Sequence, residues 1–288
     1  MILAQLANVF KLRIGLLIAF TALAGYAVTP GKTLSWLEIV LLGLVVLISS
    51  ASSGAFNQYI ERDLDALMDR TSQRPFVTGV FSKGQHWIWI IVLMLLSAVV
   101  LASVLFNVMV AFHVFMGAFV YGVVYTLWLK RRSTMNIVIG GLAGSFAVLA
   151  GAAAADPSLS PSAWLMAAVL FLWTPPHFWS LAIAIRRDYA AAGVPMLPVV
   201  IGDRSATWVI LANTVLLVGV SVLPAFYDFS LGWIYLCGAV AGGLWFIFRN
   251  IQLVMNPCKS RAMSNFFASL IQLTLVLICA ILDIHLLS

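Results

Sequence analysis

Charged residues are scarce in this chain of 288 residues, of which Asp, Glu, Lys and Arg make up only 9%. Hydrophobic residues make up 63%. A typical water-soluble domain carries about 25% charged residues, so this composition excludes a water-soluble globular protein. It indicates an integral membrane protein, whose polar residues are few enough to be considered one by one.

Cysteine is also rare, and its spacing excludes several kinds of site. Cys237, Cys258 and Cys279 lie singly in or beside apolar segments, without a Cys-x-x-Cys pair. A zinc ribbon or a thioredoxin-like redox motif would need such pairs. We therefore expect buried free thiols rather than disulfides or metal ligands.

Long apolar runs are what the chain has instead. A hydrocarbon core about 30 Å thick needs about 20 apolar residues per helix. Runs of that length predict nine transmembrane helices, near residues 12–28, 36–56, 87–106, 109–129, 135–155, 163–184, 207–226, 231–248 and 265–286. We expect an all-α polytopic protein in which residues 1–288 form a single integral-membrane domain.

The basic residues test this number of spans, because Lys and Arg accumulate in cytoplasmic loops. All of the 16 basic residues except Lys32 fall in alternate loops, beginning with the N-terminal segment. This predicts a cytoplasmic N-terminus and, after nine spans, a C-terminus across the membrane. The net charge of +6 is spread over separate loops, so it does not indicate a nucleic-acid partner.

Four of the ten acidic residues fall within nine positions, directly after the second span. If the helix continues there, Asn57, Glu61 and Asp65 share one face, because they recur every four residues. Asp69 extends the series at its edge, whereas Asp63 points to the opposite side. Amide and carboxylate oxygens suit Mg²⁺, and the predicted metal ligands are Asn57, Glu61, Asp65 and Asp69.

Basic residues follow these acids at once. They could hold phosphate groups that Mg²⁺ bridges to the carboxylates, and they are Arg62, Arg70, Arg74 and Lys83. The stretch therefore predicts a diphosphate site. The competing interpretation is a solvated face of mixed charge. The four-residue spacing and the position at the end of a membrane helix argue against it.

The pattern N-x-x-x-[DE]-x-x-x-D followed by R-T-x-x-R-P, from Asn57 to Pro75, resembles the first motif of the UbiA superfamily of intramembrane prenyltransferases. This resemblance implies a bundle of nine helices whose first motif binds a prenyl diphosphate through Mg²⁺. Glu61 stands where that motif commonly has Asp, which keeps the carboxylate and moves it by one methylene.

Three further stretches resemble the branch of the superfamily that farnesylates protoheme IX: residues 125–145, 173–183 and 186–202. The resemblance implies farnesyl diphosphate and protoheme IX (heme B) as substrates, and heme O and diphosphate as products. It departs from this branch at residues 146–149, Phe-Ala-Val-Leu, where a Pro-Pro pair is usual.

The resemblance also implies roles for residues outside the first motif. Asp188 is the one acid in the second polar stretch, and we expect it to act with Asn57, Glu61 and Asp65 in catalysis. The expected diphosphate partners from these later stretches are Lys130, Arg131, Arg187 and Tyr189. For each basic residue, the alternative is a purely topological role in a cytoplasmic loop.

His177 follows Pro175 and Pro176 inside an apolar span, where two prolines can open a helix around a cavity. Histidine is a usual axial ligand of heme iron, so we expect His177 to bind heme. A hydrogen bond between two helices is the alternative role.

Two other functions stay open. One is a related enzyme that prenylates a quinone precursor or a chlorin, and the other is a transporter. A transporter would be expected to show repeated halves with broken helices, which the sequence lacks. The favoured hypothesis, a prenyltransferase, places the chain in the lipid bilayer of a bacterial inner membrane. It leaves open a heme A synthase or a terminal oxidase assembly as a partner.

Overall fold

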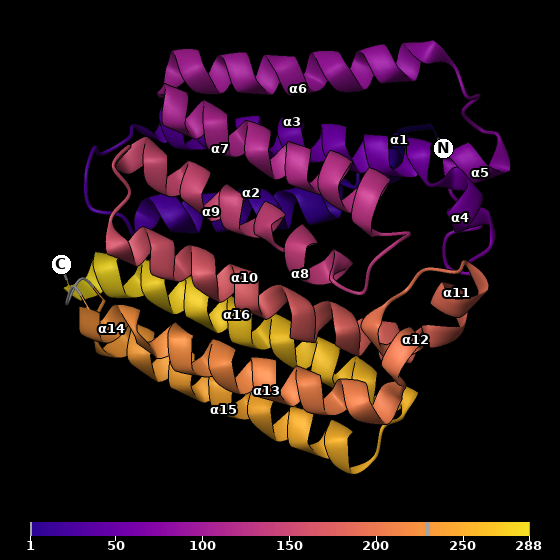
Figure 1. Cartoon of the computed structure of the whole chain (residues 1–288). Helices are drawn as coiled ribbons and strands as arrows, with labels where there is room; N and C mark the ends of the chain where they lie inside the picture. Colours follow the sequence, from indigo (N-terminus) through magenta and orange to yellow (C-terminus); the bar gives the residue numbers. More distant parts are fainter. Residues whose placement is uncertain (1, 228–230, 288) are drawn as a thin grey trace.

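The computed structural model describes residues 2–227 and 231–287, and in this part of the chain every regular element is helical. Figure 1 shows the long helices lying side by side. These are α2 (Leu12–Ala27), α3 (Trp36–Ile60), α6 (Gln85–Leu105), α7 (Val108–Phe119) with the π-helix η1 (Val120–Leu129), α9 (Leu142–Ala155), α10 (Pro161–Ala184), α13 (Asp203–Val222), α15 (Trp233–Met255) and α16 (Lys259–Leu287).

Short helices lie between the long ones or extend them. They are α1 (Ile2–Val9), α4 (Arg62–Ala66), α5 (Pro75–Thr78), α8 (Asn136–Gly140), α11 (Arg186–Ala191), α12 (Leu197–Ile201) and α14 (Pro224–Tyr227). Among the described residues, eight helices are long and apolar enough to cross a membrane, and the pair α1 and α2, bent by 49°, gives a ninth if it is counted as one span. The predicted all-α polytopic class is confirmed, and the nine predicted spans agree with this higher count.

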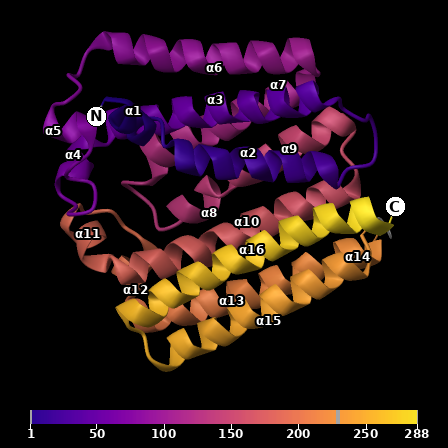
Figure 2. The same ribbon diagram turned by 180° about the vertical axis from the view of Figure 1, so that it is seen from behind.

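The long helices form two packed groups. In the first, α2 packs on α3 and α9, while α7 packs on α6 and α9. In the second, α10 packs on α13 and α16, and α15 packs on both of these. Contacts of α9 with α10 and of α2 with α16 join the groups, as Figures 1 and 2 show from opposite sides.

Close helix contact in the first group depends on glycine. A Cβ atom added at Gly151 would lie 1.7 Å from the Ala22 carbonyl oxygen, and one at Gly25 would lie 2.3 Å from the Val148 carbonyl oxygen. Small residues allow this approach of α2 and α9, which supplies van der Waals contact where lipid removes the hydrophobic driving force.

The prolines of α10 do not open the helix as the sequence suggested, because α10 is continuous through Pro175 and Pro176. Pro176 has no N–H to offer to the carbonyl of Leu172, four residues earlier. The Asn213 amide of α13 donates to that carbonyl at 3.3 Å instead. A neighbouring helix therefore satisfies the freed backbone group.

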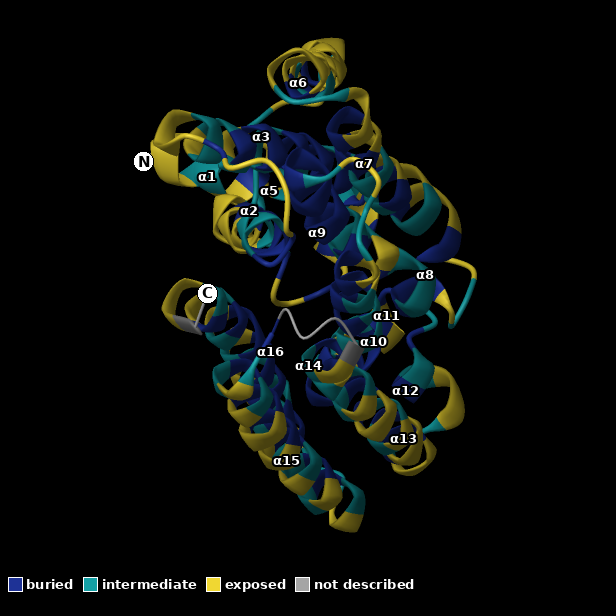
Figure 3. Ribbon diagram, turned by 90° about the vertical axis from the view of Figure 1, so that its left-hand side faces the viewer, coloured by how far each residue is buried: buried dark blue, intermediate teal, exposed yellow. Residues whose placement is uncertain are grey.

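Exposed residues gather on the outward surfaces of the bundle, and the interior between the helices is buried (Figure 3). Many of the exposed residues are large and apolar, such as Trp89 on α6 and Leu244 on α15, as expected of surfaces that face lipid. The cysteines are free, as predicted. The expectation that all are buried is wrong, since Cys237 is exposed and the other two are half-buried.

The ends of the bundle differ. The N-terminus lies at the same end as α4, α5, α11 and α12, whereas the C-terminus lies at the opposite end (Figures 1 and 2). An odd number of spans requires this arrangement of the termini. The end that holds α4 and α11 is the one where the polar residues singled out above come together.

Candidate functional site

The predicted polar face of Asn57, Glu61 and Asp65 is present. Helix α3 ends at Ile60 and α4 follows after Glu61, yet the four-residue hydrogen bonding continues across this junction. The Glu61 N–H donates to the Asn57 carbonyl at 2.9 Å, and the Asp65 N–H donates to the Glu61 carbonyl at 2.8 Å. The three residues are 2%, 0% and 1% exposed.

Each of the two buried carboxylates is paired with a cation from elsewhere in the chain. The Lys130 ammonium donates to Glu61 Oε2, and the Arg74 guanidinium donates to Asp65 Oδ2 at 2.7 Å. Taking such charges out of water costs several kcal/mol per ion. Pairing offsets this cost, and it brings the loop before α5 and the end of η1 against the end of α3.

Asn57 connects the carboxylates to two further helices. Its amide nitrogen donates to the Thr126 hydroxyl at 3.0 Å, and its Oδ1 accepts from the Lys11 ammonium at 2.5 Å. Lys11 also donates to the Tyr121 hydroxyl at 3.0 Å. We call Lys11, Asn57, Glu61, Asp65, Arg74 and Lys130 the charged cluster.

Two carboxylate oxygens of the charged cluster are still available to a ligand. Glu61 Oε1 and Asp65 Oδ1 are buried and have no hydrogen-bond partner among the described residues. Two carboxylates on one helix face, with water and phosphate oxygens completing the coordination, are what Mg²⁺ commonly uses. The residues present therefore fit a divalent cation that is shared with a phosphate.

Asp69 does not join this face. It is exposed in the turns after α4, and among the described residues no group of three or more acidic, His or Cys side chains could hold a metal ion. The α4 helix ends at Ala66, so the four-residue period that the sequence prediction extended to Asp69 stops one turn short.

A second wall of the site comes from α11, across from the charged cluster. Arg70 donates to the Tyr189 hydroxyl at 3.2 Å, and its Nε lies 3.9 Å from the Asp188 carboxylate. Its guanidinium also lies over the Tyr189 ring. Burial raises the pKa of the Tyr189 hydroxyl, so it stays protonated at neutral pH. Asp188 is thus linked to the first motif through Arg70, and its role in catalysis stays a prediction.

Four other predicted diphosphate partners lie outside the charged cluster. Arg62 donates to the Tyr59 carbonyl at 2.8 Å, and Arg131 makes two hydrogen bonds to the exposed Asp63. Lys83 and Arg187 are exposed. In this structure these four side chains fit the topological alternative at least as well as a binding role.

His177 lies between α10 and α16, among aromatic rings. Its ring stacks on Trp173 at 4.1 Å and on Phe266 at 4.3 Å between centroids. Its Nδ1 lies 2.7 Å from the Ser269 hydroxyl oxygen. These contacts are those of a histidine that links two helices, which is the alternative role given above. Heme ligation by His177 stays a prediction.

The sequence did not predict three residues of this site. They are Lys11, which belongs to the charged cluster, and its neighbours Tyr121 and Thr126. Lys11 was counted only among the basic residues that set topology. Tyr121 and Thr126 belong to η1, whose wider turn places Thr126 so that its hydroxyl donates to the Tyr121 carbonyl at 2.8 Å. Such π-helical segments frequently occur at functional sites, but no sequence pattern marked this one.

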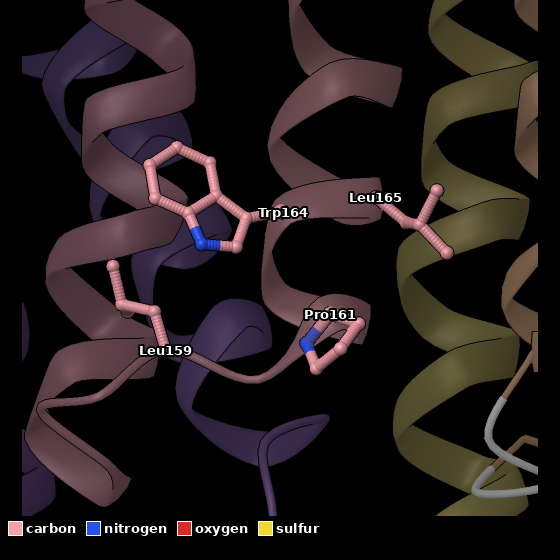
Figure 4. Close-up of a pocket in the computed structure, with 4 residues that line it drawn as sticks. All are labelled: Leu159, Pro161, Trp164 and Leu165. Atoms are coloured by element: carbon pink, nitrogen blue, oxygen red, sulfur yellow. The ribbon is translucent and has the colours of Figure 1, made fainter.

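An apolar hollow lies at the other end of the bundle. Its lining, shown in Figure 4, consists of Leu159, Pro161, Trp164 and Leu165 at the start of α10. A second apolar hollow lies between α8, α10 and α13, with Trp179 and Asn213 among its lining residues. Neither hollow contains a charged residue, so neither can hold a diphosphate by itself.

Comparisons with known proteins relate the whole chain to one family. The sequence model of the UbiA prenyltransferase family matches residues 18–271. Two curated proteins of Paramagnetospirillum magneticum, protoheme IX farnesyltransferase 2 and protoheme IX farnesyltransferase 1, are 54% and 46% identical to the chain. Each alignment covers 98% of this chain, and 97% and 98% of the respective relative.

Solved structures resemble the fold at lower identity. A structure described as digeranylgeranylglyceryl phosphate synthase has a TM-score of 0.81 and 18% identity, over 99% of both chains. A UbiA homolog from Archaeoglobus fulgidus, solved with DMAPP and Mg²⁺, has a TM-score of 0.71 and 16% identity, over 98% of this chain and 99% of that one. Both likenesses concern the arrangement of the helices.

Proposed function

The chain belongs to the UbiA prenyltransferase family, and from this premise we propose that it transfers the farnesyl group of farnesyl diphosphate to a vinyl group of protoheme IX. The observation that carries the proposal is the 54% identity, over 98% of the chain, to a protein named protoheme IX farnesyltransferase 2. The product would be heme O, with release of diphosphate. Residues 1–288 would act as one membrane domain.

The charged cluster is the proposed diphosphate site. Glu61 Oε1 and Asp65 Oδ1 would hold Mg²⁺, which supplies charge stabilisation to the leaving diphosphate when it is bound. Asn57, the third predicted ligand on this face, accepts a hydrogen bond from Lys11 at its Oδ1 instead. Lys130, Arg74 and Arg70 would supply further positive charge, and preorganised charge is most effective in a water-poor site. Asp188 and Tyr189 hold Arg70 in place.

The remaining predicted residues have more peripheral roles in this proposal. Arg62, Lys83, Arg131 and Arg187 lie around the same end of the bundle and would contribute long-range attraction for the anionic substrate. If His177 binds the heme iron, it does so through Nε2, because Nδ1 is hydrogen-bonded to Ser269. Protoheme IX would be a substrate here, without a redox role for its iron.

The proposed reaction balances as follows. The bond between carbon 1 of farnesyl and the diphosphate oxygen breaks, and its electron pair leaves with diphosphate. The π electrons of the protoheme vinyl group form the new carbon–carbon bond. The cation that results on the porphyrin side takes up the oxygen of water, which releases one proton. The chain's part is to hold diphosphate and to keep bulk water away from the allylic cation.

The membrane setting is part of the proposal. The chain is a multi-pass membrane protein, and we place it in a bacterial inner membrane with the charged cluster on the cytoplasmic side. A reporter that is active only in the periplasm should be active after Ser288 and silent after Lys83. The opposite pattern would reverse this orientation. A heme A synthase or terminal oxidase assembly stays a possible partner.

A prenyltransferase with a quinone precursor or chlorin as acceptor is the second candidate, because the charged cluster would serve any prenyl diphosphate. The relatives' names favour protoheme. Family membership supports an enzyme rather than a transporter.

The test is expression in a bacterium that cannot make heme O, followed by mass spectrometry of the extracted hemes. We expect a heme heavier than protoheme IX by one farnesyl group and one hydroxyl group. The matched control is Glu61→Ala, with its membrane level checked by immunoblot, which should yield protoheme IX alone. A prenylated quinone or chlorin instead of heme O would favour the second candidate.

A further inference from the structure

Lys11 occupies an unusual backbone position. It lies at the break between α1 and α2, with φ 48° and ψ 42°, the left-handed conformation. A non-glycine residue pays roughly 1 kcal/mol or more for this conformation. Such a conformation persists only where surrounding contacts fix it, and the side chain of Lys11 makes contacts of this kind.

The side chain of Lys11 reaches inward from this break. Its ammonium donates to Asn57 Oδ1 at 2.5 Å and to the Tyr121 hydroxyl at 3.0 Å, and it lies 5.6 Å from the centre of the Tyr121 ring. Helix α3 leaves room for the stem at Gly54, where an added Cβ would lie 3.2 Å from Lys11 Cβ. Two partners and a matched gap fix a single geometry.

The charge of Lys11 changes the balance of the charged cluster. The charged groups close enough to act on it are Arg74, Glu61, Lys130 and Asp65. Without Lys11, the two salt bridges of this cluster are electrically neutral. When Lys11 is protonated, three cations face two carboxylates and the cluster carries one uncompensated positive charge. Burial disfavours that charge, and an anion bound beside it would favour the protonated form of Lys11.

We propose that Lys11 is a positioning residue for diphosphate binding: it holds the Asn57 amide oxygen and the Tyr121 hydroxyl at the charged cluster, and its charge attracts the anionic end of the prenyl diphosphate. The first span thereby takes part in the site that the second span and η1 build. This inference rests on the proposed function, but on the binding of the diphosphate and not on the identity of the prenyl acceptor.

A purely structural role predicts something different. If Lys11 only fastened α1 and α2 to α3, then its replacement would lower stability and would weaken charged and uncharged ligands alike. If it attracts the diphosphate, then replacement weakens the charged ligand selectively. The discriminating quantity is therefore the ratio of the two affinities.

The experiment measures equilibrium binding of farnesyl thiolodiphosphate, an unreactive analogue that keeps the diphosphate, and of uncharged farnesol to the purified protein in nanodiscs. Lys11→Met should raise the Kd of the thiolodiphosphate by about tenfold or more, as expected for loss of an interaction with a charged group. The Kd of farnesol should stay within about twofold, which is the scatter expected when no contact is lost.

Three further variants complete the set. Lys11→Arg keeps the charge and should recover most of the thiolodiphosphate affinity, while Arg13→Met, an exposed basic residue two positions away, should bind like the wild type. If Lys11→Met fails to fold, then Lys11→Gln, which keeps a donor for Asn57 and removes the charge, should show the same selective loss.

The outcomes separate the two proposals. Wild-type affinity for thiolodiphosphate in Lys11→Met or Lys11→Gln, or an equal loss for farnesol, overturns the role of Lys11 and leaves the proposed function intact. Failure of the wild-type protein to bind thiolodiphosphate, with farnesol still bound, overturns the proposed function and this inference together.

Discussion

Two buried polar regions of this bundle differ in kind. The charged cluster joins the end of α3 and α4 to other parts of the chain, through Lys11 between α1 and α2, Arg74 before α5 and Lys130 after η1. The second region lies among α10, α13, α15 and α16 and is made of neutral groups. There the Asn265 amide donates to the Ser180 hydroxyl at 2.8 Å, and the Asn250 amide donates to the Thr214 hydroxyl at 2.7 Å. We call these four residues, with His177, Ser269 and Gln272, the neutral set.

The difference separates binding from packing. In the neutral set, single hydrogen bonds link neighbouring helices, as polar side chains commonly do in membranes. In the charged cluster, full charges are paired inside the protein and two carboxylate oxygens are left over on one side. Buried ions are costly and mark functional sites in membrane proteins, which supports the proposed binding of diphosphate by the charged cluster.

The largest expected effect follows from removing a carboxylate of the charged cluster. Glu61→Ala or Asp65→Ala should lower farnesyl transfer by at least about 100-fold, because each removes a proposed metal ligand and leaves Lys130 or Arg74 unpaired. The measurement is heme O formed per amount of membrane protein. Asp63→Ala is the matched control, since Asp63 lies in the same short helix but is exposed, and it should stay within about threefold.

Equal loss in all three variants would break the comparison, because it would mean that the buried face is not special. A chelator of divalent cations should abolish transfer by the wild type. Transfer that is undiminished by the chelator would contradict the proposed metal.

A histidine of the neutral set gives the next largest effect, this time on stability. His177→Ala should lower the free energy of unfolding by about 2–4 kcal/mol, because it removes a ring stacked between Trp173 and Phe266. The same variant tests heme ligation, because the Soret band of protoheme bound to the protein keeps its position if His177 only packs between helices. A shifted Soret band would show that His177 ligates iron, and would move it from the neutral set to the substrate site.

Local periodicity explains which parts of the site the sequence could predict. Asn57, Glu61 and Asp65 lie four residues apart on one continuous hydrogen-bonded path, so a helical projection places them correctly. The same projection failed at Asp69, because the helix ends at Ala66 and nothing in the apolar pattern marks that end. Helix spans were predictable for a similar reason, since the membrane fixes their length.

Pairings between distant segments were not predictable from the sequence. Lys130 was expected as a cation of the site, but its pairing with Glu61 spans 69 positions and depends on the π-helical turn of η1. Lys11 was missed because its approach to Asn57 needs a left-handed break between two helices. Neither feature has a signature in residue type or spacing.

A third test examines the weakest member of the neutral set. Gln272 is fully buried, and neither of its amide atoms has a partner among the described residues. Replacing this amide with an apolar chain of similar size removes an unsatisfied group, so Gln272→Met should raise the free energy of unfolding by about 1 kcal/mol. Heme O formation should not change. Lost transfer with retained folding would show that the neutral set also binds substrate.

The smallest expected effect concerns the ion pair of Asp63 with Arg131, which lies beside the charged cluster but is solvent-exposed. The Arg131 guanidinium lowers the pKa of the Asp63 carboxyl. A carboxyl with a lower pKa in the folded state contributes stability above its unfolded pKa, and this contribution is lost as the pH falls through the folded value.

Because 59% of the Asp63 side chain is exposed, solvent screening limits the contribution of this ion pair to stability to less than about 1 kcal/mol. Thermal unfolding of Asp63→Asn and the wild type should therefore differ slightly at pH 7, and the difference should shrink as the pH falls below the ordinary range of an Asp carboxyl. A large difference at pH 7, comparable with that of Asp65→Asn, would mean that burial does not distinguish the two acids and would remove the physical basis for separating them.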